Sequence, residues 1–318
     1  MLSRVAENLY WISRYVERAE NVARLLDVGF FIELDAPGLT AGGPEGGAVE
    51  GVLTILACRS AFQRVHPGGG RDAVLHFLTF DRQHRQSILA MIARARENAR
   101  GTQEALSAEA WRQINTMYLY LESRRALRRF RASPSRFFDG IKRGCILFAG
   151  LIDGTLPRSE AFHFLQLGRY LERVGQVSRI LNVRLHDLRD PDAPTAEPAV
   201  RTIQWSSLLR SCSAYEAFLR QHHERIDPPG IVRYLVLDAD FPRAMRFCVA
   251  RCLESLRAIA ADSGFGAEAE RLLGRLDSEL RYLDVGEILG QGLSPFLSGI
   301  QDACNRIGDE IHRAYFFS

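Results

Sequence analysis

VAENLYWISRYVERAENVARLLDVGF, residues 5–30, carries apolar side chains at alternating steps of four and three residues. Those positions are Val5, Leu9, Ile12, Val16, Ala19, Ala23, Leu26 and Phe30. Because an α-helix has about 3.6 residues per turn, this spacing draws one apolar stripe down a helix. The segment therefore predicts a long amphipathic helix that buries one face.

Helical patterns continue along the rest of the chain. Further helices are predicted at about 49–65, 84–106, 107–131, 134–150, 158–186, 203–222, 240–262, 266–284 and 293–315. Segments 36–48 and 187–199, rich in Pro with Gly or Asp, are predicted to be loops, and the first could close over a site or be disordered. Only residues 231–237 (IVRYLVL) suggest a strand. The predicted fold class is all-α.

The motif at residues 14–18 (RYVER) returns 155 positions later at residues 169–173 (RYLER). A shift of 157 also lays Arg94, Glu97 and Arg100 on Arg251, Glu254 and Arg257, and Asp81 on Asp238. Motifs in the same order at nearly the same offset predict an internal duplication, with half-repeats at about 1–154 and 155–318. Since each half would need the other to cover its apolar faces, we expect a single helical bundle domain, 1–318, with a pseudo-twofold relation.

Charge and hydropathy suggest a soluble protein. The formal net charge is +3, from 41 basic and 38 acidic residues that mostly interleave, so neither nucleic acid nor a membrane is an expected partner. No apolar run approaches the ~20 residues of a membrane span, and the start lacks the profile of a signal peptide. The expected location is the cytoplasm. Lys142 is the one lysine, so nearly every cation is a guanidinium suited to bidentate pairing.

The six cysteines lie in apolar helical stretches without a CxxC pair, which predicts reduced, buried thiols. Cys248 and Cys252 are near His222 and His223 in the sequence, but their spacing matches no standard zinc pattern. We therefore predict no metal site.

The first helix also has a polar face, opposite its apolar stripe. It carries Arg14, Glu17, Arg18, Asn21 and Arg24. Such a face could be a solvated surface, a buried Arg–Glu network that docks the two motif helices, or a surface that binds an anion. Exposed charges can drift after a duplication, so their retention in both copies favours the network, and next to it the anion site. Residues 94–100 (RARENAR) allow the same readings.

Motifs of known enzymes are missing. The sequence has no GxSxG, HExxH, GxxxxGK[ST] or strand-linked GxGxxG motif. Glu17 and Glu172 are candidate catalytic acid/base residues if their helices face each other. Residues 153–155 (DGT) are expected to cap the second motif helix, with a ligand loop as the alternative.

Over essentially its full length the chain resembles the bacterial alpha-E domain family, an all-helical group named for its Glu-Arg motif. The segments that carry the resemblance are Tyr10–Leu26, Ala95–Arg100, Trp111–Tyr118, Leu167–Arg173 and Phe241–Arg243. The chain departs from the family pattern at three places: Ile152 for Thr, Val174-Gly175 for Ala-Asp, and Ala244 for Ser.

This resemblance implies a partnership with circularly permuted ATP-grasp proteins, and proximity to transglutaminase-like proteins. The implied role is that of an accessory or substrate-handling component in an amide- or peptide-bond-forming system, with ATP and Mg bound by the partner ligase and no cofactor bound directly. The alternatives are an enzyme in its own right and a purely structural scaffold. The candidate ligand- or partner-binding residues are Arg14, Tyr15, Glu17, Arg18, Asn21, Arg24, Arg94, Glu97, Asn98, Arg100, Asp153, Arg169, Tyr170, Glu172, Arg173 and Arg243.

Overall fold

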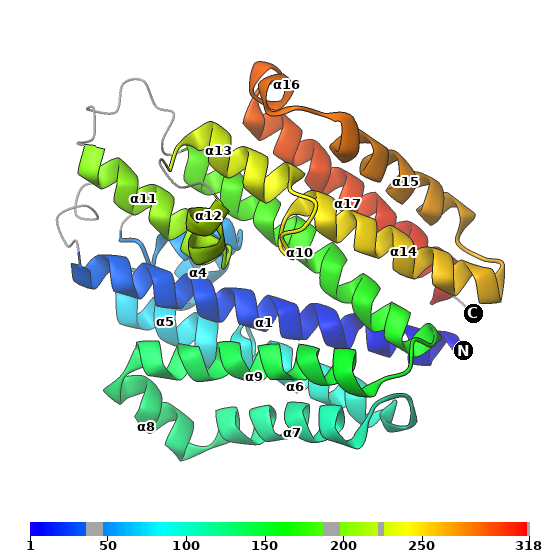
Figure 1. The fold of residues 1–318 in the computed structure, drawn as a ribbon. Helices are drawn as coiled ribbons and strands as arrows, with labels where there is room; N and C mark the ends of the chain where they lie inside the picture. Colours follow the sequence, from blue (N-terminus) through cyan, green and yellow to red (C-terminus); the bar gives the residue numbers. More distant parts are fainter. Residues whose placement is uncertain (36–46, 187–197, 222–225, 317–318) are drawn as a thin grey trace. The chain divides into compact units, whose positions relative to one another are not determined.

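The computed structural model describes residues 1–35, 47–186, 198–221 and 226–316, and all regular structure in these ranges is helical (Figure 1). The all-α prediction is thus confirmed for the described residues. The chain divides into two compact units, Met1–Gly168 and Arg169–Ser318. The predicted single domain with half-repeats at 1–154 and 155–318 stays a prediction. Most of the loop expected at 36–48 and most of the loop expected at 187–199 lie outside the described residues.

The first unit is organised around α1 (Ser3–Asp35), which packs against α6 (Ile88–Arg100) and α9 (Pro134–Thr155) (Figure 1). The apolar stripe of α1 supplies its core contacts, since Leu9, Ile12 and Leu26 are fully buried. The long amphipathic helix predicted from residue 5 is therefore confirmed, and it runs a few residues further at each end.

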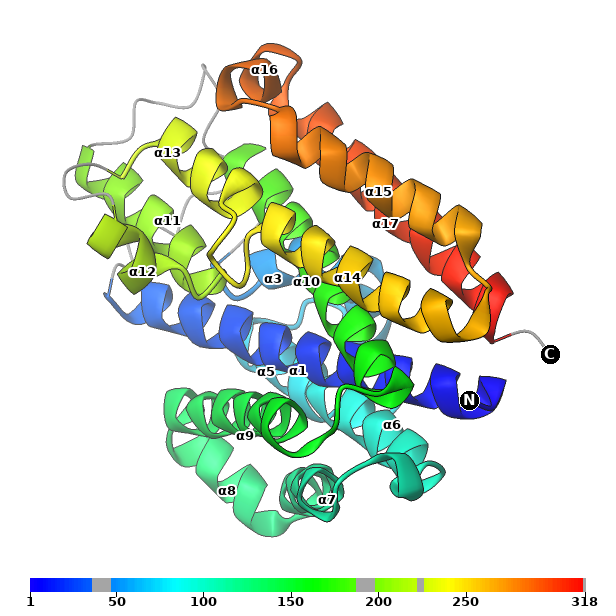
Figure 2. The same ribbon diagram turned by 45° about the vertical axis from the view of Figure 1, so that its right-hand side comes forward.

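The other helices that lie wholly within the first unit are shorter than α1. They are α3 (Gly51–Ile55), α4 (Arg59–Val65), α5 (Arg71–Phe80), the 3₁₀ turn η1 (Gln103–Ala105), α7 (Ala108–Glu122) and α8 (Arg124–Ala132). Helix α7 packs against α9, and the short α8 connects them (Figure 2). Helix α5 was not predicted. The single helix predicted at 49–65 is interrupted after Ile55, where Ala57 has a left-handed φ of 51°.

The single helix predicted at 107–131 is also wrong, because it breaks at Ser123. This residue is extended (φ −82°, ψ 148°) and is at once the C-cap of α7 and the N-cap of α8. Its hydroxyl accepts a hydrogen bond from the backbone N–H of Ala126 and donates one to the carbonyl of Tyr120. Serine favours such capping positions because its side chain replaces a missing helical partner.

The boundary between the units falls within α10 (Glu160–His186). The second unit continues with α11 (Pro198–Ser211), α12 (Tyr215–Gln221), α13 (Pro228–Val232), the π-helix η2 (Arg233–Leu237), α14 (Met245–Ser263), α15 (Ala267–Tyr282), α16 (Val285–Gly290) and α17 (Leu293–Tyr315). Helix α15 packs against both α14 and α17. Residues 231–237, the one strand-like stretch, are helical, and their apolar side chains Ile231, Val232, Leu235 and Val236 are buried.

Each unit contains one turn of the same form before a long helix. In the first unit, Oδ1 of Asp81 accepts hydrogen bonds from the backbone N–H groups of Gln83 (2.8 Å) and His84 (3.1 Å). Ser87 then caps α6 by accepting from the N–H of Ala90. In the second unit, Asp238 accepts from the N–H groups two and three residues ahead, at 2.8 and 2.6 Å. Ala244 stands where Ser87 does, so α14 begins without a side-chain cap.

The six cysteines are free and buried, as predicted. Within the described ranges, no group of three His, Cys, Asp or Glu residues is placed to hold a metal ion. None of the helices in that part of the chain is both long enough and apolar enough to cross a membrane.

Candidate functional site

The polar face of α1 is largely buried. Glu17, Glu20 and Asn21 are 5%, 2% and 3% exposed, while Arg14 and Arg18 are half-buried. This burial excludes the solvated surface that was one reading of the face. Carboxylates are rarely buried unless they are paired or hydrogen-bonded. Glu20 forms an ion pair with Arg24, one helical turn away.

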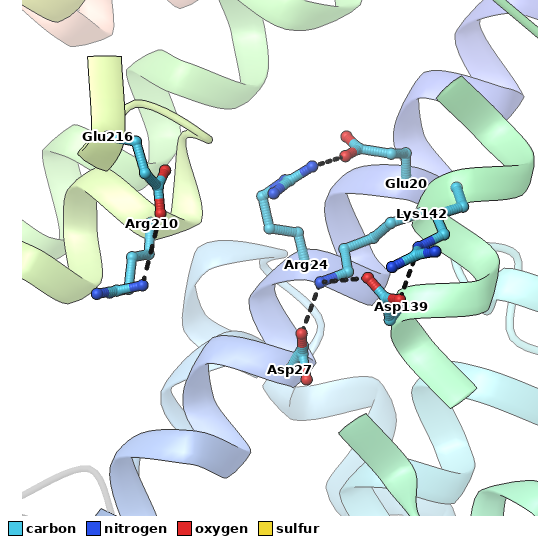
Figure 3. A network of polar contacts seen from close by, with 8 residues as sticks. Glu20, Arg24, Asp27, Asp139, Lys142, Arg210 and Glu216 are labelled. Carbon is cyan, nitrogen blue, oxygen red and sulfur yellow. Dashed lines mark hydrogen bonds and ion pairs between the residues drawn. The ribbon is translucent and has the colours of Figure 1, made fainter. Parts of the chain in front are cut away.

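Further along α1, Asp27 forms a bridge to α9 through Lys142, the one lysine of the sequence (Figure 3). Nζ of Lys142, on α9, lies 2.6 Å from Oδ2 of Asp27 and 3.9 Å from Oδ1 of Asp139. Asp139 in turn pairs with Arg143 at 2.8 Å. Lys142 and Asp27 are each 16% exposed, so water screens this pair only partly. The bridge holds α9 in place beside the motif helix.

Four residues of α1 and one of α6 form what we call the aromatic–arginine cluster: Tyr10, Trp11, Arg14, Tyr15 and Arg94. The guanidinium of Arg14 lies 5.0 Å from the ring centroid of Trp11 and 5.3 Å from that of Tyr10, and it donates a 2.9 Å hydrogen bond to the Tyr10 hydroxyl. Trp11 stacks on Tyr15, with ring centroids 5.4 Å apart. The guanidinium of Arg94 lies 5.9 Å from the Tyr15 ring.

Within this cluster Arg94 differs from its neighbours on α6. It is half-buried, and no acidic side chain pairs with it among the described residues. Arg96 and Arg100 instead share Glu97, at 2.7 and 2.9 Å. Arg94 therefore presents a partly desolvated cation, held over an aromatic ring, that is available to an anion.

A second contact fixes α6 against α7. Nε of Arg96 donates a 2.8 Å hydrogen bond to Oδ1 of Asn115, and its guanidinium lies 4.7 Å from the ring of Tyr118. Asn115 and Tyr118 had been noted only as part of the family resemblance, and Arg96 was not among the candidate site residues. The sequence of α7 shows an Asn and a Tyr three residues apart on a half-polar helix. This pattern alone does not indicate that Arg96 of α6 contacts them.

The second unit has a related arrangement. The guanidinium groups of Arg169 and Arg173 lie 4.9 and 5.5 Å from the ring of Tyr170. Tyr170 meets Phe247 edge-on at 5.9 Å, and Arg251 lies 5.2 Å from the Phe247 ring. In the first unit the motif tyrosine contacts the helix-α6 arginine directly. In the second, Phe247 stands between the motif tyrosine and the corresponding arginine.

A family model described as a predicted alpha-helical domain with a conserved ER motif, Alpha-E, matches residues 1–316. The chain belongs to the Alpha-E family. Uncharacterized proteins of Mycobacterium bovis (Mb2597) and Mycobacterium tuberculosis (MT2643 and Rv2567) are each 22% identical to it over 329 aligned positions. The alignments cover 96% of this chain and 36% of each relative, so the chain spans about a third of their length. No solved structure matches the chain.

Glu172, of the second ER motif in this Alpha-E chain, is 1% exposed. Its Oε1 accepts a 3.2 Å hydrogen bond from Gln176 and lies 3.9 Å from the guanidinium of Arg179. Arg173, the motif arginine, donates to the carbonyl of Pro242 at 3.1 Å. Arg243 is half-buried in the turn that follows Asp238. The two motif carboxylates are therefore enclosed in the fold, and Glu172 is held by residues of its own helix.

The capping role expected for Asp153 and Thr155 is wrong. Both residues lie in the last turn of α9, and α10 begins only at Glu160. Helix α9 runs past its predicted end at residue 150 because Ile152 is buried in the core. Oδ1 of Asp153 accepts a 2.6 Å hydrogen bond from Gln166, which ties the end of α9 to α10 within the first unit.

One half-buried histidine of the Alpha-E chain, His84, lies apart from these motifs. His84 stacks on Phe77, with ring centroids 4.1 Å apart, and its Nε2 atom is buried without a hydrogen-bond partner among the described residues. Burial lowers the pKa of His84, and the nearby Asp81 carboxylate opposes this with a smaller effect. The neutral imidazole is thus the form that the fold accommodates.

Proposed function

We propose that this Alpha-E chain is an accessory helical protein of an ATP-dependent amide- or peptide-bond-forming system, and that its aromatic–arginine cluster holds a carboxylate-bearing group. The observation that carries the proposal is Arg94, a half-buried arginine over Tyr15 with no acidic partner in the described part of the chain. A partly buried cation without a counter-charge is costly, so a bound anion would stabilise it.

The chemistry of the cluster suits a carboxylate. A guanidinium offers two parallel N–H donors, which match the two oxygens of a carboxylate, and a ring beside it restrains its orientation. Tyr15 supplies that ring for Arg94, and Trp11 supplies it for Arg14. Trp11 and Tyr15, which are stacked, lie between the two cations and would offer an apolar flank to the ligand.

The partner that we propose is a circularly permuted ATP-grasp protein, on the strength of the family resemblance. That ligase would bind ATP and Mg and perform the bond-forming step, while this chain presents the substrate. A transglutaminase-like protein would be a further component of the same system. This role would place the chain in the cytoplasm, where ATP is available.

We further infer that the chain arose by duplication of a half of about 155 residues. The two Asp turns support this, since Asp81 and Asp238 accept the same pair of backbone hydrogen bonds. The link from the motif tyrosine to the next long helix supports it as well, through Arg94 in one unit and through Phe247 and Arg251 in the other. A pseudo-twofold relation of the halves belongs to the same proposal.

In the first motif, burial separates Glu17 from the half-buried Arg14 and Arg18. Glu17 and Glu172 are almost fully enclosed, which suits a structural role better than acid/base chemistry on a substrate. This favours a scaffold function for the motif carboxylates, the second candidate function, and weighs against the chain as an enzyme that uses these two residues. The proposal therefore assigns structure to the glutamates and binding to Arg94 and Arg14.

The test is ATP turnover by the ATP-grasp protein encoded nearest to this chain, measured as ADP release on mixed amino acids with and without the chain. We expect the chain to raise turnover or change the substrate range, and Arg94→Gln to reduce that effect. Arg112→Gln is the matched control, at an exposed arginine of α7 that forms no ion pair within the described part of the chain. If the ligase alone has the same rate and range as the mixture, the proposed function is wrong.

A further inference from the structure

The surface of α8 is unusually basic. Residues 123–138 (SRRALRRFRASPSRFF) contain six arginines and no acidic residue, although charges interleave over the chain as a whole. All six side chains are exposed, and among the described residues none of them makes an ion pair. We call these residues the α8 basic face: Arg124, Arg125, Arg128, Arg129 and Arg131 of α8, with Arg136 in the first turn of α9.

The acidic residues that border this segment are already engaged elsewhere. Glu122, just before it, pairs with Arg82, and Asp139, just after it, pairs with Arg143 and lies near Lys142. Exposed arginines in other helices are often paired along their own helix, such as Arg271 with Glu268 and Arg313 with Glu310. The α8 basic face therefore keeps a concentrated positive charge that no side chain of the described residues neutralises.

The stability of α8 does not explain this composition. Arg124 and Arg125 occupy the first turn, where the helix dipole favours acidic residues and opposes cations. Arg124 with Arg128, and Arg125 with Arg129, are like charges one turn apart, which destabilises a helix. The helix is held instead from its other side, where Phe130 packs edge-on against Phe80 and Phe137 at 5.2 and 5.5 Å. Residues that destabilise the helix they belong to are expected where they are needed for binding.

We infer that the α8 basic face is a docking surface for a carboxylate-rich segment of a partner protein. Arginine is enriched in protein interfaces and pairs bidentately with carboxylates. Helix α8 has nine residues, about 14 Å at 1.5 Å per residue, and spans only about four phosphates of a nucleic acid strand. The buried residues of α8 are Ala126 and Phe130, so no exposed aromatic ring of this helix is available to stack on bases and no exposed apolar face to enter a membrane.

This inference goes beyond the proposed function and does not depend on what Arg94 binds. It is tested with the full chain and a fluorescein-labelled polyglutamate peptide, by fluorescence anisotropy at low and moderate salt, beside a DNA duplex of equal net charge. The test variant is Arg124→Glu with Arg125→Glu. Each new carboxylate would meet an arginine one turn ahead and the positive end of the helix dipole, so the fold should be retained or stabilised.

We expect the double variant to bind the peptide at least about tenfold more weakly than the wild type, because two attractive charges become repulsive. The control reverses two exposed arginines elsewhere in the first unit, Arg4→Glu with Arg112→Glu, and changes the net charge equally. Neither arginine forms an ion pair with any residue that the structure describes. The control variant should bind as the wild type does.

Three outcomes would overturn the inference. Equal binding by the wild type and the double variant would show that α8 is not the surface used. An equal loss in the control would show that only net charge matters. Tighter binding of the DNA than of the peptide, lost in the double variant, would assign the face to nucleic acid instead. Thermal unfolding of each variant shows whether a loss of binding reflects unfolding.

Discussion

The Nε atom of Arg96 lies 2.8 Å from the side-chain oxygen of Asn115, so a single amide fixes the orientation of an arginine on the neighbouring helix. The other end of the guanidinium reaches Glu97, and its face lies over Tyr118. Arg96 thus has a complete set of partners within the first unit. Arg94, two residues earlier on the same helix, lies over the ring of Tyr15 and pairs with no acidic side chain in the described ranges.

Replacing Asn115 with leucine should lower the free energy of unfolding by about 1–2 kcal/mol, since it removes the acceptor of a charge-assisted hydrogen bond in a half-buried place. Denaturant unfolding followed by circular dichroism gives the value. Thr116→Ala, at an exposed position of the same helix, should change stability by less than about 0.5 kcal/mol. Equal effects of both changes would mean that the Arg96–Asn115 bond contributes nothing.

Lys142→Met should destabilise the protein by about 1–3 kcal/mol, because Asp27 would remain half-buried without its cation. Adding Asp27→Asn to this variant should restore part of the loss, since the uncompensated charge disappears. A double-mutant cycle on the two changes gives the coupling free energy. Strictly additive effects would mean a coupling free energy of zero, so the bridge between α1 and α9 would not stabilise the fold.

Gly168→Ala should destabilise the protein by about 1–3 kcal/mol, despite the higher helix propensity of alanine. A Cβ atom at Gly168 would overlap with the backbone carbonyl of Tyr10, and neither backbone can move aside alone. Gly150→Ala in α9, where nothing lies within 4 Å of the added atom, should instead stabilise by up to about 1 kcal/mol. Thermal unfolding of both variants decides, and a stabilised Gly168→Ala protein would refute the close approach of α10 to α1.

The stability of the protein should fall as the pH drops below about 6.5, the ordinary pKa of histidine, partly through His84. Burial lowers the pKa of His84 in the folded state, so the unfolded chain binds its proton first and acid favours unfolding. His84→Gln should have a shallower decline of stability between neutral and mildly acidic pH. Melting temperatures across that range measure the slope, and an unchanged slope would exclude a role for His84.

The cysteines should be inert in the native protein. Burial raises the pKa of Cys58 from 9.0 to about 12, so it carries almost no reactive thiolate near neutral pH. Ellman's reagent should therefore detect few thiols before denaturation and all six afterwards. Rapid labelling of Cys58 in the native state would mean that the first unit opens locally around it.

Much of the fold could be predicted, because the long helices carry a clear apolar stripe. Leu9 and Ile12 lie where the 3.6-residue period places them, and α17 has the predicted bounds. The interruptions could not be predicted in the same way. Serine also occurs inside helices, so Ser123 does not by itself predict an end to the helix. The break depends on tertiary contacts that the sequence does not show, such as that of Phe130 with Phe80. Residues 231–237 are apolar except for Arg233, so their spacing does not distinguish a strand from a buried helix.

The sequence predicted several residues of the candidate site but not the contacts between them. The sequence marked Tyr15, Glu17 and Arg94, yet charged faces are usually solvated, and nothing in the sequence distinguishes a buried Glu17 from an exposed one. The approach of Arg94 to Tyr15 joins helices more than fifty residues apart in the chain. Asp153 was predicted to cap the second motif helix because aspartate is a good capping residue. The sequence does not show that Ile152 is buried, which extends α9 to include Asp153.

Ser123 fixes the rotational phase of α8. It is the whole connection between α7 and α8, serving as the last cap of one helix and the first cap of the other. One residue inserted or deleted within α8, between its first turn and Phe130, would turn Phe130 by about 100° relative to the first-turn arginines. Phe130 and those arginines would then no longer lie on opposite sides of the helix. An Alpha-E sequence with a gap inside this helix should therefore lack the basic surface altogether.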